Sequence, residues 1–446
     1  MTSLENLGYR QELSRALTVR DLVVYGMVFM VPISPFGVFG FVYKDAHGMV
    51  VLAYLLGLAG MFFTATSYAL MSRAFPLAGS VYSYVGKGLH ETLGFFAGWL
   101  ILLDYILLPA LLYIFCAVAL RPLLPGVTDA IWLVSFVVFN ALVNLVGVRV
   151  TARVNFCILG LEIAALAIFV AVGLLALYRG QGAGALTLRP LYDPVVFSTA
   201  TVAAATSIAV LSFLGFDGIS TLAEESAGGH NAVAHATLAS LALVGVLLIL
   251  QTWIAADLAQ GAQFSSPETA FYEIAQRAGG AQLRLLVIGV NILATGIANA
   301  LVAQAAVSRI LYAMARDRRL PAALARVHPR FRTPHVSTLV VAAISVAVGL
   351  FFARRLDDLT RIVNFGALSG FLLLHVAVIN HFVIRGRSRA WFRHLLMPLA
   401  GFVVIGYVLY EMDSTAKIMG AMWIGAGIVY FAVLTLVLRK PAAIEL

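Results

Sequence analysis

The segment Val31-Pro32-Ile33-Ser34-Pro35-Phe36-Gly37 places two prolines and a glycine in the middle of a long apolar stretch. Pro32 and Pro35 each remove a backbone donor and clash with a continuing helix, while Gly37 permits unusual dihedral angles. One proline would give an ordinary kink, but two prolines three residues apart and a following glycine predict an unwound segment. The helix formed by this stretch is therefore expected to break here.

The chain around this segment is too apolar to be covered by water. Of its 446 residues 61% are hydrophobic and 11% are charged, and the mean hydropathy is +0.95. Soluble proteins are about 45–50% apolar and about 25% charged. A helix needs about 20 apolar residues to cross the hydrocarbon of a bilayer. Segments of that kind lie at 19–42, 50–72, 93–120, 130–147, 154–178, 196–223, 236–256, 285–313, 335–353, 359–384, 395–411 and 418–438. The sequence therefore predicts an all-α integral membrane protein of about twelve transmembrane helices.

The positive charges indicate how such a protein would be oriented. If the N-terminus is cytoplasmic, 20 of the 30 Lys and Arg residues fall on the cytoplasmic side of the twelve segments. Cytoplasmic loops of membrane proteins carry this excess, so both chain ends are expected there. The net charge of +9 then reflects topology, and no nucleic-acid partner is expected.

The sixth apolar segment repeats the pattern of the first. At Ser212-Phe213-Leu214-Gly215-Phe216-Asp217-Gly218, two glycines bracket an acidic residue inside an apolar helix. Unwound backbone in hydrocarbon costs several kcal/mol per unpaired group unless it faces protein or a wet cavity. Breaks at corresponding positions of two five-helix halves point to an inverted-repeat transporter that binds its substrate between them. Close helix packing is the alternative for such glycines, as expected for the GxxxG pair Gly94 and Gly98.

This symmetry gives a domain plan for a single membrane domain, 1–446. It comprises a cytoplasmic N-terminal segment (1–18), a first repeat (19–178), a second repeat (196–384) and two additional helices (395–438). The two breaks and one tyrosine are the expected substrate site. The predicted substrate-binding residues are Ile33, Ser34, Phe36, Gly37, Tyr105, Phe213, Gly215, Phe216 and Asp217.

Several of these groups have structural alternatives. The ring of Tyr105 could cover an ammonium group, in which case phenylalanine would replace it better than alanine. Asp104 beside it either binds substrate or pairs within the bundle. Asp217 either binds substrate or caps the restarted helix. The pair Glu224-Glu225 is expected to form a structural or gating ion pair.

Glu162 is the principal candidate for coupling charge to transport. It lies inside an apolar helix with no basic residue near it in sequence. A carboxyl group in that position must become neutral, find a partner or face a wet cavity. Glu162 could therefore exchange a proton or attract a cationic substrate, and a buried ion pair with a distant arginine is the alternative.

Enzyme chemistry is not indicated. The sequence has no HExxH, GxSxG or phosphate-binding P-loop motif, and its two cysteines show no metal-binding spacing. No cofactor and no metal are expected. Energy for transport is expected from an ion gradient or from exchange.

Six motifs in order resemble the amino acid, polyamine and organocation transporter family, most of all the bacterial putrescine importers. They are Pro32 to Gly40, Phe75 to Ser80, Leu103 to Pro109, Ser212 to Asp217 followed by Glu224-Glu225, Val307 to Tyr312, and Ile362 to Ala367. The resemblance covers nearly the whole chain. It implies a five-plus-five inverted-repeat (LeuT-like) fold with two added helices, a place in the inner membrane of a bacterium, and proton-coupled uptake or exchange of amines or amino acids. It also implies substrate contacts at both breaks and at Tyr105.

Three departures from the family pattern bear on the substrate. Ser34-Pro35-Phe36 replaces most of the glycine-rich nest that holds a substrate carboxylate in amino-acid-binding members, which argues against an ordinary amino acid. The putrescine importers carry an acidic residue near the position of Gly37, and its loss weakens the case for putrescine itself. Several amino-acid members have a lysine near the position of Glu162, where an acid instead suits a cationic substrate.

We therefore expect a secondary active transporter that imports a small organic amine, with a polyamine such as putrescine as the first candidate and protons as the coupling ion. An amino-acid transporter or exchanger of the same fold is the nearest alternative. A channel or membrane receptor is the alternative from another class. The expected partners are the amine or amino acid, protons and the lipid bilayer.

Overall fold

The computed structural model describes residues 17–77, 79–121, 124, 126–146, 151–229, 231–331 and 333–437, with the backbone alone at 151–155. In these ranges the regular secondary structure is helical, apart from one isolated β-bridge between Leu17 and Ser226. The α-helices are α1 (Val19–Met30), α2 (Pro35–Asp45), α3 (Val50–Ala74), α4 (Ser80–Gly88), α5 (Glu91–Leu120), α6 (Asp129–Val146), α7 (Thr151–Tyr178), α8 (Thr199–Ala209), α9 (Ala232–Ala259), α10 (Ala270–Asn291), α11 (Ala300–Arg316), α12 (His335–Phe352), α13 (Leu356–Val378), α14 (Met397–Glu411) and α15 (Ser414–Ala432).

Tighter or wider helical turns join or extend several of these helices. The 3₁₀ turns are η3 (Val210–Phe213), η4 (Asp217–Glu225), η5 (Pro267–Thr269) and η7 (Ala322–Ala325), and the π turns are η6 (Ile292–Asn299), η8 (Ile379–Arg385), η9 (Phe392–Leu396) and η10 (Val433–Val437). The expected segment 1–18 lies almost wholly outside the described residues, as do the loop residues Arg149, Arg332, Arg439 and Lys440.

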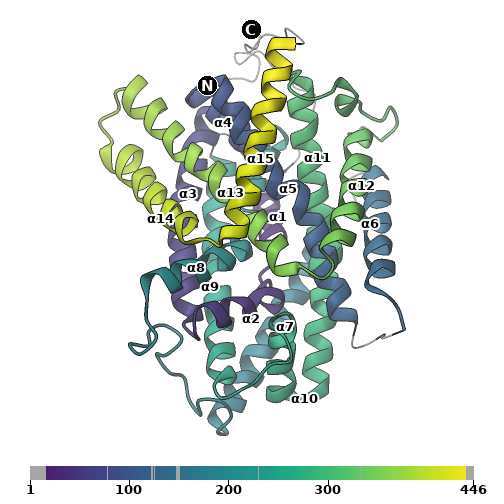
Figure 1. Cartoon of the computed structure of the whole chain (residues 1–446), viewed down its shortest axis with the longest axis vertical. Helices are drawn as coiled ribbons and strands as arrows, with labels where there is room; N and C mark the ends of the chain where they lie inside the picture. Colours follow the sequence, from purple (N-terminus) through teal and green to yellow (C-terminus); the bar gives the residue numbers. More distant parts are fainter. Residues whose placement is uncertain are drawn as a thin grey trace.

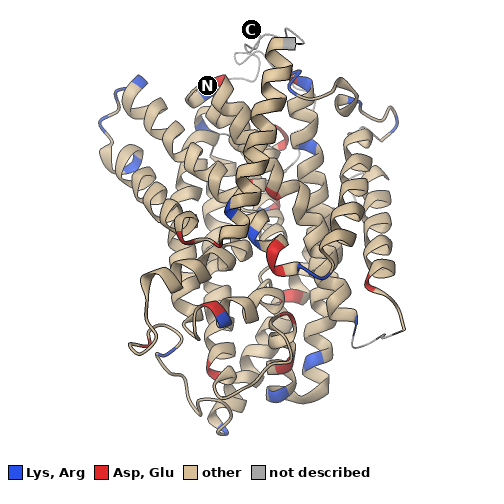
Figure 2. Cartoon of the chain, in the orientation of Figure 1, with Lys and Arg blue, Asp and Glu red and all other residues tan. Residues whose placement is uncertain are grey.

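The number of membrane spans agrees with the sequence. Among the described residues, eleven helical segments are long and apolar enough to cross a bilayer, and there are twelve if α1 and α2, bent by 53° at a short break, are counted as one span. Figure 1 shows these helices packed side by side in one elongated bundle. Figure 2 shows that most of the ribbon carries no charged residue. The predicted all-α membrane architecture is confirmed.

Helix ends are fixed by local sequence. Thr18 and Asp21 form a capping box at the start of α1, in which each side chain accepts a hydrogen bond from the other residue's backbone amide. Pro35 occupies the first position of α2, where a helix needs no amide donor. The same proline that interrupts the first span therefore also restarts it.

Glycines allow close helix contacts around α5. A Cβ at Gly94 would lie 2.5 Å from the Cα of Gly86 in α4, which confirms the close packing expected from the GxxxG pair. On the other side of α5, a Cβ at Gly366 of α13 would lie 2.8 Å from the backbone nitrogen of Asp104. These contacts hold α5, which carries Asp104 and Tyr105, against the centre of the bundle.

Candidate functional site

The first break interrupts the span between α1 and α2. Val31 ends α1 with φ 53°, an unusual backbone angle for a β-branched residue. The side-chain amide of Gln251 in α9 donates a 2.7 Å hydrogen bond to the carbonyl of Pro32. A neighbouring helix thus bonds the carbonyl group of Pro32, which lies in the break. The predicted unwound segment is present.

The second break lies between η3 and η4. Leu214 is extended, and Gly215 has φ 117°, a conformation that side-chain-bearing residues rarely adopt. The chain then resumes as the 3₁₀ turn η4, which begins at Asp217. The second predicted interruption is therefore also present, at Leu214 to Phe216.

The two breaks touch each other. A Cβ on Gly215 would lie 2.8 Å from the carbonyl carbon of Phe29, and one on Gly218 would lie 2.2 Å from the ring of Phe29. Only glycine lets the second broken span approach the backbone of the first this closely. Phe29, near the end of α1, is consequently the residue around which the two breaks meet.

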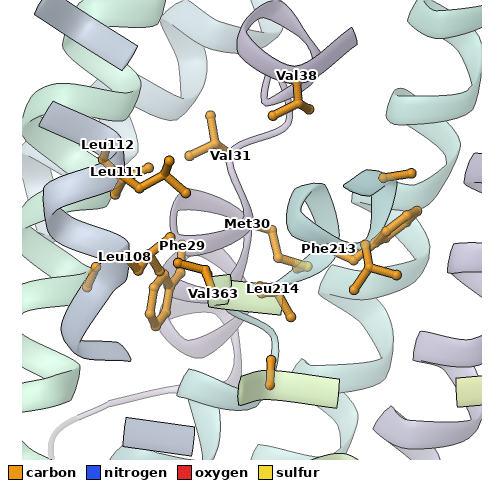
Figure 3. Packing of buried hydrophobic residues seen from close by; sticks show 14 of the residues in the cluster. Phe29, Met30, Val31, Val38, Leu108, Leu111, Leu112, Phe213, Leu214 and Val363 are labelled. Atoms are coloured by element: carbon orange, nitrogen blue, oxygen red, sulfur yellow. The ribbon is translucent and has the colours of Figure 1, made fainter. Parts of the chain in front are cut away.

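A cavity of about 40 Å³ opens beside this contact. Figure 3 shows Phe29, Met30 and Val31 of the first break between the leucines of α5 and Phe213 and Leu214 of the second. The cavity is lined by Phe29, Met30, Val31, Ser34, Gly37, Val38, Leu108, Leu112, Phe115, Leu211, Ser212, Leu214, Asn291, Thr295 and Asn299. Its walls come from both breaks, from α5, and from the end of α10 with η6.

Two buried oxygens of this lining are unpaired. Ser34 Oγ and Asn299 Oδ1 are buried and have no hydrogen-bond partner among the described residues. By contrast, Asn291 donates to the hydroxyl of Tyr272 at 2.8 Å and accepts from Thr295 at 2.9 Å. Both oxygens can accept a hydrogen bond from a molecule in the cavity, and the Ser34 hydroxyl can also donate one.

Several backbone amides at the two breaks donate hydrogen bonds within the protein. The amides of Ser34, Phe36 and Gly37 donate to the carbonyls of Val31, Ile33 and Ser34 at 2.8, 2.9 and 3.1 Å. At the second break, the amide of Gly215 donates to Asp217 Oδ1 at 3.2 Å. The protein's own carboxylate thus takes an amide that could otherwise bind the carboxylate of a substrate.

Of the nine predicted binding residues, Ser34 and Gly37 line the cavity. Phe36 instead stacks on Phe271 of α10, with ring centroids 4.4 Å apart. Phe216 packs edge-on against Tyr68, and Phe213 packs against Tyr54. Ile33 is fully buried in the apolar core. Gly215 is where the breaks meet, and contacts of these residues with a substrate stay predictions.

Tyr105 and Asp217 are hydrogen-bonded to each other, next to the cavity residue Phe29. The hydroxyl of Tyr105 donates a 2.6 Å hydrogen bond to Asp217 Oδ2, and its ring meets that of Phe29 edge-on with centroids 6.1 Å apart. Both oxygens of Asp217 are thus bonded within the protein, and its carboxylate bonds the amide of Gly215, which precedes η4, so it does not cap η4 as the structural alternative expected. Its role as a ligand remains a prediction.

Glu162 is fully buried on α7, and neither of its carboxylate oxygens has a hydrogen-bond partner in the part of the chain that the structure describes. Arg20 of α1 lies over the ring of Phe156, and Phe36 of α2 contacts Phe169. These two contacts bracket Glu162, so α7 runs beside the first broken span at its level. No described basic side chain forms a salt bridge with Glu162, and the alternative of a buried ion pair is not realised among them.

The acidic pair after the second break does form ion pairs. Glu225 lies 3.3 Å from Arg309 and Glu224 lies 3.9 Å from Arg316, both on α11. These bonds join the end of the second broken span to α11. The ion pairs expected at Glu224-Glu225 are therefore present, while a gating role stays a prediction.

Three polar residues at the end of α10 and along η6 were not predicted from the sequence to line the site. Asn291, Thr295 and Asn299 are spaced four residues apart, which places them on one face of a helix, and all three line the cavity. That spacing of uncharged polar residues within an apolar span was the available signal. No group of His, Cys, Asp and Glu suited to a metal ion occurs among the described residues.

Comparison with protein families and known proteins gives consistent matches. The family model described as amino acid permease matches residues 22–438. The low-affinity putrescine importer of Escherichia coli (strain K12) is 30% identical over 97% of this chain and 96% of its own length. The methylthioribose transporter of Bacillus subtilis (strain 168) is 26% identical over 94% of each chain. A branched-chain amino acid permease of the same organism is 28% identical over 83% of this chain and 81% of its own length.

A solved structure has the same fold. It is that of a Na⁺-coupled sialic acid symporter in a substrate-bound outward-open state, with a TM-score of 0.59 and 11% sequence identity. The match covers 92% of this chain and 93% of the symporter. The LeuT-like fold expected from the paired breaks is confirmed by this similarity.

Proposed function

This chain belongs to the amino acid permease family and is a multi-pass secondary transporter of amino acids or amines, and from that premise we propose that it imports a small organic amine together with protons. A polyamine such as putrescine is the first candidate. The E. coli relative is named as a putrescine importer, which supports this choice of substrate class.

One observation carries the proposal. Two oxygens of the cavity lining, Ser34 Oγ and Asn299 Oδ1, have no partner among the described residues, while the amides of Ser34, Phe36, Gly37 and Gly215 already donate within the protein. An ammonium group is a donor without acceptors, so it can donate to both oxygens, whereas a carboxylate cannot form a hydrogen bond with Asn299 Oδ1. The carbonyl end of α1 also points to this region, and the negative end of a helix dipole favours a cation.

Three buried carboxyl groups of the membrane-spanning helices have no basic partner among the described residues. Asp104, Glu162 and Asp217 are each at most 2% exposed, and none of them forms a salt bridge with a described Lys or Arg. Intramembrane acids of this kind are costly unless they are neutralised or paired. A cationic substrate or a proton would offset that cost, which supports amine binding and proton coupling at Glu162.

An amino-acid substrate is the second candidate. The branched-chain amino acid permease among the relatives favours it. The amide of Gly215 could bind the carboxylate of such a substrate only after release from Asp217. Both candidates share one topology, for which the excess of Lys and Arg supports cytoplasmic chain ends.

Ligand-dependent stability tests the proposal. Purified protein would be heated with putrescine, butylamine, leucine or arginine, because a ligand that binds the native state raises its stability by about 2.7 kcal/mol at about 100 times Kd. We expect the amines to raise the unfolding temperature and leucine to leave it unchanged. Asn299→Leu should abolish the shift, while Asn380→Leu, which alters an asparagine bonded to the carbonyl of Gly88 away from the cavity, should retain it. Stabilisation by leucine alone would overturn the amine assignment.

A further inference from the structure

Asp104 is a buried carboxyl group with no assigned partner. Its side chain is 2% exposed, and its Oδ1 has no hydrogen-bond partner among the described residues. The neighbouring acid differs, because Asp217 is bonded by the hydroxyl of Tyr105 and the amide of Gly215. A buried carboxylate without a partner is expensive, so Asp104 requires a proton or a cation.

Asp104 shares a helix face with the wall of the cavity. Leu108 and Leu112 of α5 line the cavity, and they follow Asp104 by four and eight residues. Residues at this spacing lie above one another on one face of a helix. Asp104 therefore lies one turn, about 6 Å along the helix axis, before the cavity wall at Leu108.

Phe29 connects the cavity to the surroundings of Asp104. Its side chain lines the cavity, and its ring also contacts Tyr105, the residue next to Asp104. Figure 3 shows Phe29 on the same side of the first break as Leu108. An aromatic side chain, which can change rotamer, thus borders both places.

We propose that Asp104 binds the second ammonium group of an aliphatic diamine whose first ammonium lies in the cavity at Ser34 and Asn299. This proposal rests on the proposed function, because it assumes that the cavity binds an amine. One helical turn is comparable with the length of a short aliphatic chain, and Leu108 supplies an apolar surface for its methylenes. Asp104 would then make the transporter select diamines over monoamines.

The test compares putrescine with butylamine, which has the same four carbons and one amino group. Equilibrium binding of both would be measured with the purified full chain and with Asp104→Asn, which keeps the side-chain size and removes the charge. We expect Asp104→Asn to weaken putrescine binding by about 10- to 100-fold, the effect of losing a hydrogen bond to a charged group. Butylamine binding should change by less than about threefold.

Asp193→Asn is the matched control. It removes one negative charge from an outer connecting segment, where Asp193 accepts a hydrogen bond from the amide of Val195. Both affinities should stay at their parental values in this variant. Melting curves of each variant would show whether the fold is retained.

The parent protein provides a test that needs no variant. A preference for putrescine over butylamine of tenfold or more supports the second subsite, and equal affinities overturn it. If Asp104→Asn weakens both ligands equally, or neither, the subsite is also rejected while the amine transporter stands. If the parent binds neither amine, the proposed function itself fails.

Discussion

The hydroxyl of Tyr105 donates a 2.6 Å hydrogen bond to Oδ2 of Asp217, which links α5 to the second break. The other oxygen of Asp217 accepts from the amide of Gly215 at 3.2 Å. Because the ring of Tyr105 also contacts Phe29, one tyrosine touches both interrupted spans. A change at Tyr105 should therefore alter the geometry of the site as well as any direct contact with the substrate.

Replacing Tyr105 with phenylalanine tests this link. The variant keeps the ring contact with Phe29 and loses the donor to a buried carboxylate, an interaction worth about 1.5–3 kcal/mol. From the sequence alone, phenylalanine was expected to retain much of the affinity, but the hydrogen bond predicts amine binding weaker by about tenfold or more. Calorimetric titration would measure the affinity, and Tyr105→Ala should weaken it further. An unchanged affinity in both variants would leave Tyr105 as a packing residue.

Substitution of Gly215 should stop transport. A side chain there must adopt φ near 117° and approach the backbone of Phe29 to 2.8 Å, and such strain costs about 1–3 kcal/mol before the contact is counted. Gly215→Leu should nearly abolish uptake while the protein still reaches the membrane. Gly425→Ala is the control, because a Cβ at Gly425 of α15 meets nothing within 4 Å. Normal uptake by Gly215→Leu would remove the second break from the site.

The ion pair between Glu225 and Arg309 should contribute to transport. The two side chains are 20% and 17% exposed, so neutralising one leaves the other partly buried without its partner. We expect Glu225→Gln and Arg309→Gln each to slow uptake. The loss of uptake rate in the double variant, expressed as a free energy, should be smaller than the sum of the losses in the two single variants. Initial uptake rates in a double-mutant cycle would measure this coupling.

The pair between Arg121 and Asp129 gives the control for that cycle. Arg121 is 56% exposed, and surface pairs of this kind contribute about 0–1 kcal/mol. Neutralising Arg121 should leave the uptake rate unchanged. Strictly additive effects at Glu225 and Arg309 would show that their ion pair has no part in the cycle.

Glu162→Gln separates proton coupling from substrate binding. The change keeps the size of the side chain and removes its ability to ionise. If Glu162 carries the proton, the variant should lose accumulation driven by a pH gradient and keep exchange of labelled for unlabelled substrate. If Glu162 pairs with the amine, binding itself should weaken, most for diamines. Parental accumulation and binding by the variant at acid and neutral pH would exclude both roles.

The fold was largely predictable because two strong physical signals determine it. Helices long enough to cross a bilayer require long apolar segments, and those segments agree with the observed spans within a few residues at most ends. Pro32, Pro35, Gly215 and Gly218 then mark where the helices cannot continue. The contact of Gly215 with Phe29 was not predictable, since it depends on how two distant segments approach each other.

The lining of the site was predictable only in part. The sequence does not show at which residue α2 restarts, and this start decides that Ser34 faces the cavity while Phe36, in the first turn of α2, stacks on Phe271. Asn299 was not predicted, because a neutral amide in an apolar helix is a weaker sign of a site than a charged residue at membrane depth. The π turn η6 that carries Asn299 has no clear sequence signature.

Uptake of labelled putrescine into proteoliposomes containing the purified protein tests the central claim most directly. A pH gradient, acid outside, should drive accumulation above the external concentration. A protonophore should abolish that accumulation, and excess unlabelled butylamine or putrescine should compete, whereas leucine should not. The claim would be contradicted if putrescine did not enter at all, or if its uptake were indifferent to the pH gradient and blocked by leucine.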